Sequence, residues 1–109
     1  MSRVGENLSN PRHCVPVVVD TTAGGVLLAA ANPNRGQFLA YSDAGNVVIR
    51  IALDAAAGAT RYTVIMRPSA TEGAYYEMPT FGNQVYTGPV YAIADSGSGT
   101  IEVTELAKP

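Results

Sequence analysis

The feature that most constrains the fold is a series of short β-favouring runs, each bounded by turn-forming residues. The runs are rich in Val, Ile, Thr and Tyr, and the stretches between them are rich in Gly, Pro, Asn, Asp and Ser. Eight short strands in a chain of this length predict a β-sandwich or a β-barrel. Of the two we expect an all-β antiparallel β-sandwich, for which a jelly roll is one arrangement. The runs lie at residues 15–20, 25–31, 37–42, 47–53, 60–67, 74–78, 89–95 and 100–106.

Alternation within the runs predicts which faces are buried. In the fourth run Ile49 and Ile51 share one face, whereas Arg50 lies on the other. In the last run Ile101 and Val103 share one face in the same way. We therefore expect strands with one face in the core and one face toward water or a partner.

The N-terminus differs in pattern from the rest of the chain. Residues 1–14, MSRVGENLSNPRHC, show neither a helical nor a strand period and carry Gly5 and Pro11. We expect these residues to form a flexible N-terminal arm that orders on a partner, followed by a β-sandwich domain over residues 15–109. The longest apolar run, residues 26–31, is far shorter than the roughly 20 residues that cross a bilayer, so we expect no membrane partner.

The composition argues against several classes of ligand. Charged residues make up 15 % of the chain, below the roughly 25 % of an average soluble domain, so much of the surface is uncharged or covered. Seven Lys and Arg against nine Asp and Glu give a net charge of -2, and Lys108 is the only lysine, so we expect no nucleic-acid partner. A single cysteine, Cys14, cannot form an intrachain disulfide or a multi-cysteine zinc site. We predict neither a cofactor nor a metal.

Two loops are predicted to close hairpins. In SDAGN, residues 42–46, Gly45 and Asn46 tolerate positive φ and would join the run at 37–42 to the run at 47–53. The loop DSGSG, residues 95–99, would join the last two runs in the same way.

The segment NPNRG is predicted to be a structural turn formed by Asn32, Pro33, Arg35 and Gly36. Pro33 fixes φ, and Gly36 can adopt left-handed geometry. Turn chemistry does not require Arg35. We expect its guanidinium to hold the turn to backbone carbonyls or to a nearby carboxylate; the competing interpretation makes it a ligand contact.

Tyrosines are the candidate interface residues, because Tyr serves both as core filler and as an interface anchor. Tyr75 and Tyr76 are consecutive in a β-like run, so they cannot both face one core, and one must reach a second sheet, a partner or solvent. The candidate interface residues are Tyr75, Tyr76, Tyr86 and Tyr91.

An aspartic protease is the enzymatic alternative. Residues 20–22, Asp-Thr-Thr, and residues 95–97, Asp-Ser-Gly, resemble the Asp-Thr-Gly loop of the dimeric retroviral type. In the first, Thr22 stands where such a loop needs Gly, and only 12 residues follow the second. We therefore predict a protein that is not an enzyme and has no catalytic residue.

Two other pairs of residues carry side chains suited to chemistry. Glu72 and Glu77 are candidates for the paired carboxylates of a glycoside hydrolase, but the chain has no Trp to stack a sugar. That lack and the missing export signal also disfavour a periplasmic sugar-binding module. His13 and Cys14 are adjacent, and adjacent residues on an extended segment point apart, so they favour neither a metal site nor a nucleophilic pair.

Three segments, AANPNRGQFLAYSDAGNVVIRI, EGAYYEMP and YTGPVYAIADSGSGTIEVTEL, resemble small all-β structural proteins of tailed bacteriophage virions, such as head decoration proteins, head-fibre-like proteins and related tail domains. The resemblance covers residues 29–106 and departs in the Ala-rich loop at 55–59. It implies a decoration or cement protein on the head exterior, made in the bacterial cytoplasm and bound as a dimer or trimer to the major capsid protein or another virion subunit. A head–tail connector, collar, tail or baseplate component, or a host-surface-binding module, is the alternative.

Overall fold

The computed structural model describes the backbone of residues 9–82 and 84–108, and the side chains within these ranges from Val15 onward. This part of the chain contains strands and turns but no helix, and hence no helix able to cross a membrane. The ten strands are β1 (Ser9–Val19), β2 (Val26–Ala29), β3 (Arg35–Ser42), β4 (Ile49–Ala52), β5 (Val64–Met66), β6 (Ala74–Glu77), β7 (Thr80–Phe81), β8 (Gln84–Val85), β9 (Val90–Ala94) and β10 (Gly99–Ala107).

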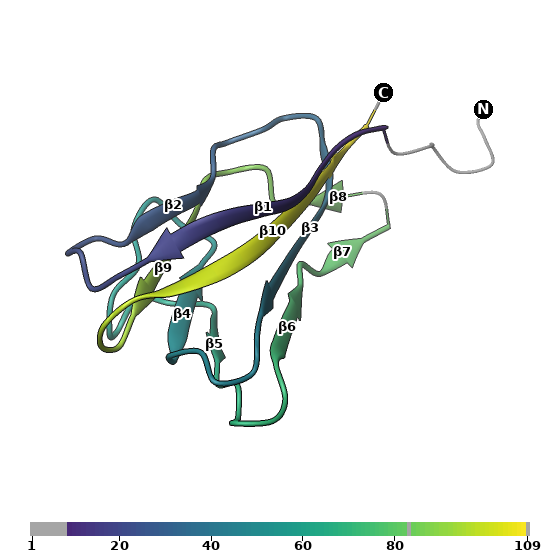
Figure 1. The fold of residues 1–109 in the computed structure, drawn as a ribbon. Coiled ribbons are helices and arrows are strands. Elements are labelled where there is room, and N and C mark those ends of the chain that lie inside the picture. The colour runs from purple at the N-terminus through teal and green to yellow at the C-terminus, as the bar shows by residue number, and fades with distance from the viewer. Residues whose placement is uncertain (1–8, 83, 109) are drawn as a thin grey trace.

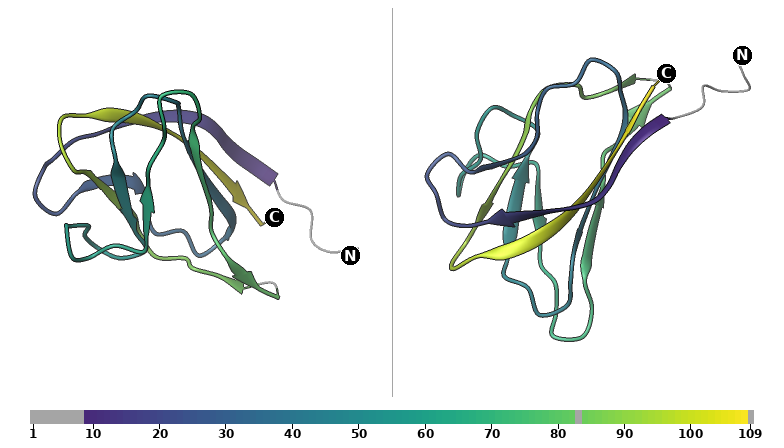
Figure 2. Two further views of the ribbon diagram at one scale, coloured as in Figure 1. Left: turned by 90° about the horizontal axis from the view of Figure 1, so that it is seen from below. Right: turned by 45° about the horizontal axis from the view of Figure 1, so that its top comes forward.

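Eight of the strands form two four-stranded sheets that face each other (Figure 1). Sheet I has the strand order β1-β10-β3-β6, and sheet II has the order β2-β9-β4-β5. The remaining two strands, β7 and β8, form a short hairpin that projects from the same end of the sandwich as the C-terminus (Figure 2).

The pairing scheme identifies the sandwich as a jelly roll. Strand β1 pairs with β10, β2 with β9, β3 with β6 and β4 with β5, and every pair is antiparallel. The chain is therefore equivalent to one long two-stranded ribbon that has been rolled up, with its closed end at β4 and β5. This confirms the all-β sandwich predicted from the sequence, including the jelly-roll arrangement.

The core lies between the sheets, where alternate residues of each strand meet. Sheet I contributes Phe38, Ile101 and Val103, and sheet II contributes Ile49 and Ile51; all five are fully buried. The alternation predicted in the fourth and last runs is confirmed. The chain has a single cysteine and therefore no intrachain disulfide. Burial of these branched and aromatic side chains is the main stabilising contribution available to it.

Each of the eight predicted runs overlaps a strand, whereas β7 and β8 lie outside the predicted runs. Both hairpin predictions are wrong. Residues 43–48 lead from sheet I to sheet II, and residues 95–98 lead back from sheet II to sheet I. The turn conformations are present, since Gly45 and Gly97 have φ of 81° and 64°. The strands they join nevertheless pair with other partners, because in a jelly roll these strands bury their apolar faces against each other across the core.

The first strand begins earlier than the sequence predicts. Residues 9–14, assigned to the N-terminal arm, belong to β1 and continue its pairing with β10. Strand β1 lies at the edge of sheet I, and its register shifts on both sides of Arg12. An edge strand with such irregularities tolerates the missing N–H of Pro11. The described part of the sandwich therefore begins at Ser9 rather than at Val15, and the rest of the predicted arm, residues 1–8, lies outside the described residues.

One core side chain carries an unsatisfied polar atom. The Tyr76 side chain packs against the core, and its buried hydroxyl has no hydrogen-bond partner among the described residues. Burial also raises the pKa of this phenol above its usual 10.0. Burial of the ring therefore stabilises the fold, whereas burial of the hydroxyl without a partner lowers the free energy of unfolding.

We expect Tyr76→Phe to raise the free energy of unfolding by about 1 kcal/mol, because it removes an unsatisfied buried hydroxyl and keeps the ring. Tyr86→Phe is the matched control, since the Tyr86 hydroxyl donates a hydrogen bond to the carbonyl of Pro89 at 2.8 Å. That substitution should lower stability by about 1 kcal/mol. Urea unfolding of both variants measures the difference. Equal losses in the two variants would contradict the assignment of the Tyr76 hydroxyl as unsatisfied.

Candidate functional site

The predicted turn at residues 32–36 leads into β3. The N–H of Arg35 donates to the carbonyl of Asn32 at 3.1 Å, and the N–H of Asn34 donates to the side-chain oxygen of Asn32 at 3.0 Å. These two bonds define a β-turn supported by an Asx turn, with Pro33 at its second position. Gly36 is instead the second residue of β3, so it belongs to the strand rather than to the turn.

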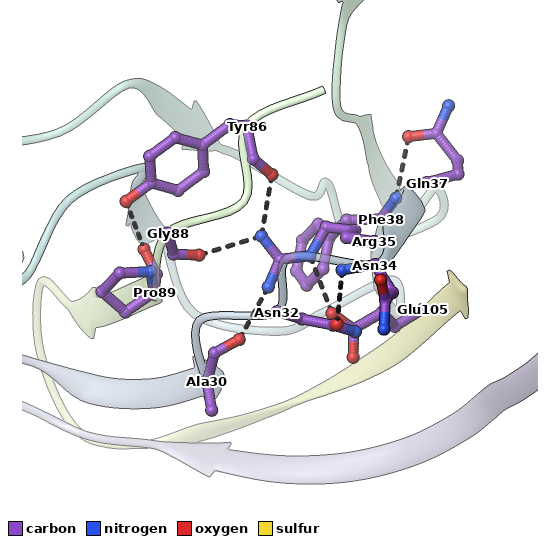
Figure 3. A network of polar contacts seen from close by, with 10 residues as sticks. All are labelled: Ala30, Asn32, Asn34, Arg35, Gln37, Phe38, Tyr86, Gly88, Pro89 and Glu105. Atoms are coloured by element: carbon purple, nitrogen blue, oxygen red, sulfur yellow. Dashed lines mark hydrogen bonds and ion pairs between the residues drawn. The ribbon is translucent and has the colours of Figure 1, made fainter. Parts of the chain in front are cut away.

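The Arg35 side chain is fully buried and bonded on all sides (Figure 3). Its Nε forms an ion pair with the Glu105 carboxylate at 2.7 Å. Its Nη1 donates to the carbonyls of Tyr86 and Gly88, both at 2.9 Å, and its Nη2 donates to the carbonyl of Ala30 at 2.8 Å. These are the two kinds of partner expected from the sequence. A guanidinium enclosed in this way joins three segments of the sandwich and is closed to a ligand.

A register irregularity directs Arg35 into the core. Between β10 and β3 the register shifts after the pair Leu106 and Gln37, so that Ala107 faces Arg35 and Gly36 has no partner in β10. Such an extra residue re-aims the side chains next to it. Glu105 needs no such device, because it follows Ile101 and Val103 in strict alternation and so faces the core.

Tyr86, another candidate interface residue, belongs to the same cluster and is partly buried. Its ring packs against the core, and its hydroxyl is held by Pro89. A Cβ at Gly88 would collide with the Tyr86 phenol, so any larger residue at this position requires the Tyr86 ring to move. Tyr91, another candidate, is half-buried on the outer face of sheet II beside Leu27.

Tyr75 is the most exposed of the candidate interface tyrosines and lies on the outer face of sheet I. It lies directly opposite Tyr41, and Tyr41 lies directly opposite Glu102. The exposed fractions are 59 % for Tyr75 and 41 % for Tyr41. We call this surface the Tyr41–Tyr75 face. It contains a groove of about 300 Å³, lined by Leu39, Ala40, Tyr41, Tyr75, Glu102 and Thr104.

On the outer face of sheet II, Arg50 contacts both an aromatic ring and a carboxylate. The guanidinium carbon of Arg50 lies 4.7 Å from the centre of the Tyr62 ring, and its Nε pairs with Asp95 at 2.8 Å. The Asp95 hydrogen bond raises the pKa of Arg50 above its usual value. Arg50 and Asp95 thus both form their contacts within the chain.

The carboxylates considered for catalysis are also engaged separately. Asp20 accepts the N–H of Thr22 at 2.9 Å, and hydrogen bonds from Thr22 lower the pKa of Asp20. Asp95 is bound by Arg50. Each of the two carboxylates is thus engaged by a partner of its own within the chain, Thr22 for Asp20 and Arg50 for Asp95. Across the part of the chain with described side chains, no three His, Cys, Asp or Glu residues are grouped to hold a metal.

The structure therefore defines a jelly-roll sandwich in which the outer face of sheet I carries two exposed, neighbouring tyrosines, the Tyr41–Tyr75 face. No protein-family model matches the chain, and neither a curated protein nor a solved structure matches it. Sequence reasoning identified Tyr75 but not Tyr41 or Glu102. The alternation of β3, β6 and β10 places all three outward, but only the strand register brings them together.

Proposed function

We propose that the protein is a non-enzymatic structural subunit of a bacteriophage virion, a decoration protein that binds the major capsid protein on the head exterior. The resemblance over residues 29–106 supports the phage context, and jelly rolls recur among viral capsid proteins. The recurrence of jelly rolls in capsids is an analogy at the level of the fold. A binding role therefore has to be inferred from the surface residues.

The observation that carries the proposal is the Tyr41–Tyr75 face. Its two tyrosines present large apolar rings with polar tips, the side-chain type most enriched at protein interfaces. They stand on the central strand β3 and the edge strand β6 of a four-stranded sheet, which holds them rigidly. A rigid aromatic pair loses little conformational entropy on binding, and many copies on a shell add avidity.

The test uses particles from a bacterial strain that carries the gene, purified on a density gradient. We expect the protein to comigrate with the particles and with isolated heads after heads and tails are separated. Comigration with tails would support the collar, tail or baseplate alternative. Absence from all particles would overturn the virion assignment.

Surface variants then test the face itself. Tyr75→Ser should lower the number of copies bound per particle by about tenfold or more, as expected for an interface anchor. Tyr62→Ser is the matched control, because Tyr62 is a similarly exposed tyrosine, at 43 %, on a part of the surface away from sheet I. It should bind like the unmodified protein. Equal binding of both variants would exclude the Tyr41–Tyr75 face as the docking surface.

A further inference from the structure

We propose that the groove on the Tyr41–Tyr75 face receives a basic side chain, an arginine or lysine, from the protein partner. This inference rests on the proposed function, because it takes that face as the docking surface. Three properties of the molecule support a basic occupant: the row of residues that lines the groove, the sign of the charge there, and a similar cluster on sheet II that already contains an arginine.

Strand pairing arranges an acid and two aromatic rings in one row. Glu102 of β10 lies opposite Tyr41 of β3, and Tyr41 lies opposite Tyr75 of β6. All three line the same groove, together with the apolar side chain of Leu39. A carboxylate beside aromatic rings favours the binding of a cation, because the ring faces and the carboxylate both attract positive charge.

Among the described side chains, the charge on this face is acidic. Along β10, β3 and β6, the charged side chains that point outward are Glu77 and Glu102. Glu77 accepts a hydrogen bond from Gln37 at 3.4 Å. The half-buried Glu102 carboxylate forms no hydrogen bond or ion pair with any residue that the structure describes. A partner that supplies a cation would satisfy it.

Sheet II shows the same three components assembled within one chain. Arg50 lies over the Tyr62 ring at 4.7 Å and pairs with Asp95 at 2.8 Å. On the Tyr41–Tyr75 face, the described residues supply the aromatic ring and the acid but not the cation. The partner's arginine would take the place that Arg50 holds on sheet II.

Charge also favours a basic protein segment over other occupants of the Tyr41–Tyr75 face. A second copy docked face to face would bring Glu102 and Glu77 against the same acids, and like charges at an interface oppose binding. A phosphate-rich surface, such as a lipid headgroup layer, would meet the same repulsion. The observations therefore favour a basic segment of a protein.

The experiment titrates the isotopically labelled full chain with N-acetyl-arginine amide and follows backbone amide signals by NMR. N-acetyl-citrulline amide, which has the same shape without the charge, is the control ligand. We expect saturable shifts at residues 39–41, 75 and 102–104 with the arginine ligand and none there with citrulline. Equal shifts with both ligands, or shifts confined to other carboxylates, would overturn the inference.

Two variants locate the binding. Glu102→Gln should weaken arginine amide binding by about fivefold, the size of one exposed charge pair. Glu72→Gln changes an exposed loop carboxylate outside the groove and should leave binding unchanged. Unaltered binding by Glu102→Gln would overturn the assignment of the acid. The particle assay is read separately: comigration with heads without arginine binding refutes only this inference, whereas arginine binding without comigration refutes only the proposed function.

Discussion

Arg35→Ala should lower the free energy of unfolding by about 3–5 kcal/mol, as expected when one partner of a buried ion pair is removed. The variant would leave Glu105, itself only 5 % exposed, in the core without this cation. It would also remove the donor to the carbonyls of Ala30, Tyr86 and Gly88. Domains of this size are stable by about 5–15 kcal/mol, so the loss is a large share of the total. Equilibrium unfolding in urea measures it.

Two further variants separate charge from geometry. Arg35→Lys keeps the positive charge but has no planar fork, so it cannot reach all four acceptors and should show an intermediate loss. The double variant Arg35→Met, Glu105→Leu removes both charges and should recover part of the loss, because no charge of the pair remains buried. A loss below about 1 kcal/mol in Arg35→Ala, the size of one ordinary hydrogen bond, would contradict a structural role for the network.

The strands were predictable because alternation is a local property. Residues such as Ile49 and Ile51 mark a buried face without reference to any other segment. The start of β1 was not predictable in this way. Residues 9–14 lack alternation and are held by pairing with β10, which is remote in sequence.

The connections show the limit of turn chemistry. Gly45 and Gly97 adopt the positive φ expected of them. A tight turn reverses the chain, but it does not specify whether the next strand joins the same sheet or the opposite one. That choice is made by which apolar faces meet across the core, which only the assembled pairing scheme determines.

The candidate site was partly visible in the sequence. Turn chemistry left Arg35 unexplained, and this predicted a structural partner for it. The partner, Glu105, has its own signal, since it occupies an inward position of an alternating strand. No comparable signal joins Tyr41 to Tyr75, because their proximity depends on the register between β3 and β6.

Gly25→Ala should lower the free energy of unfolding by about 2–5 kcal/mol, the sum of a left-handed backbone penalty and an overpacking penalty. Gly25 has a φ of 89°, and a Cβ there would lie 2.9 Å from the Ala92 carbonyl of β9 and 3.1 Å from the Ala57 Cβ. Since β2 pairs with β9 just beyond this point, relief of the contact would shift an edge of sheet II.

Its neighbour Gly24 provides the matched control. Gly24 has a nearly identical φ of 86°, but a Cβ there would meet no atom within 4 Å. Gly24→Ala should therefore show the backbone penalty alone, about 1–2 kcal/mol. The difference between the two variants in urea unfolding isolates the close approach of β9 from the strain of positive φ. Equal losses would mean that the backbone at Gly25 moves away from Ala92 without cost, and that the packing of β2 on β9 is looser than the contact distances imply.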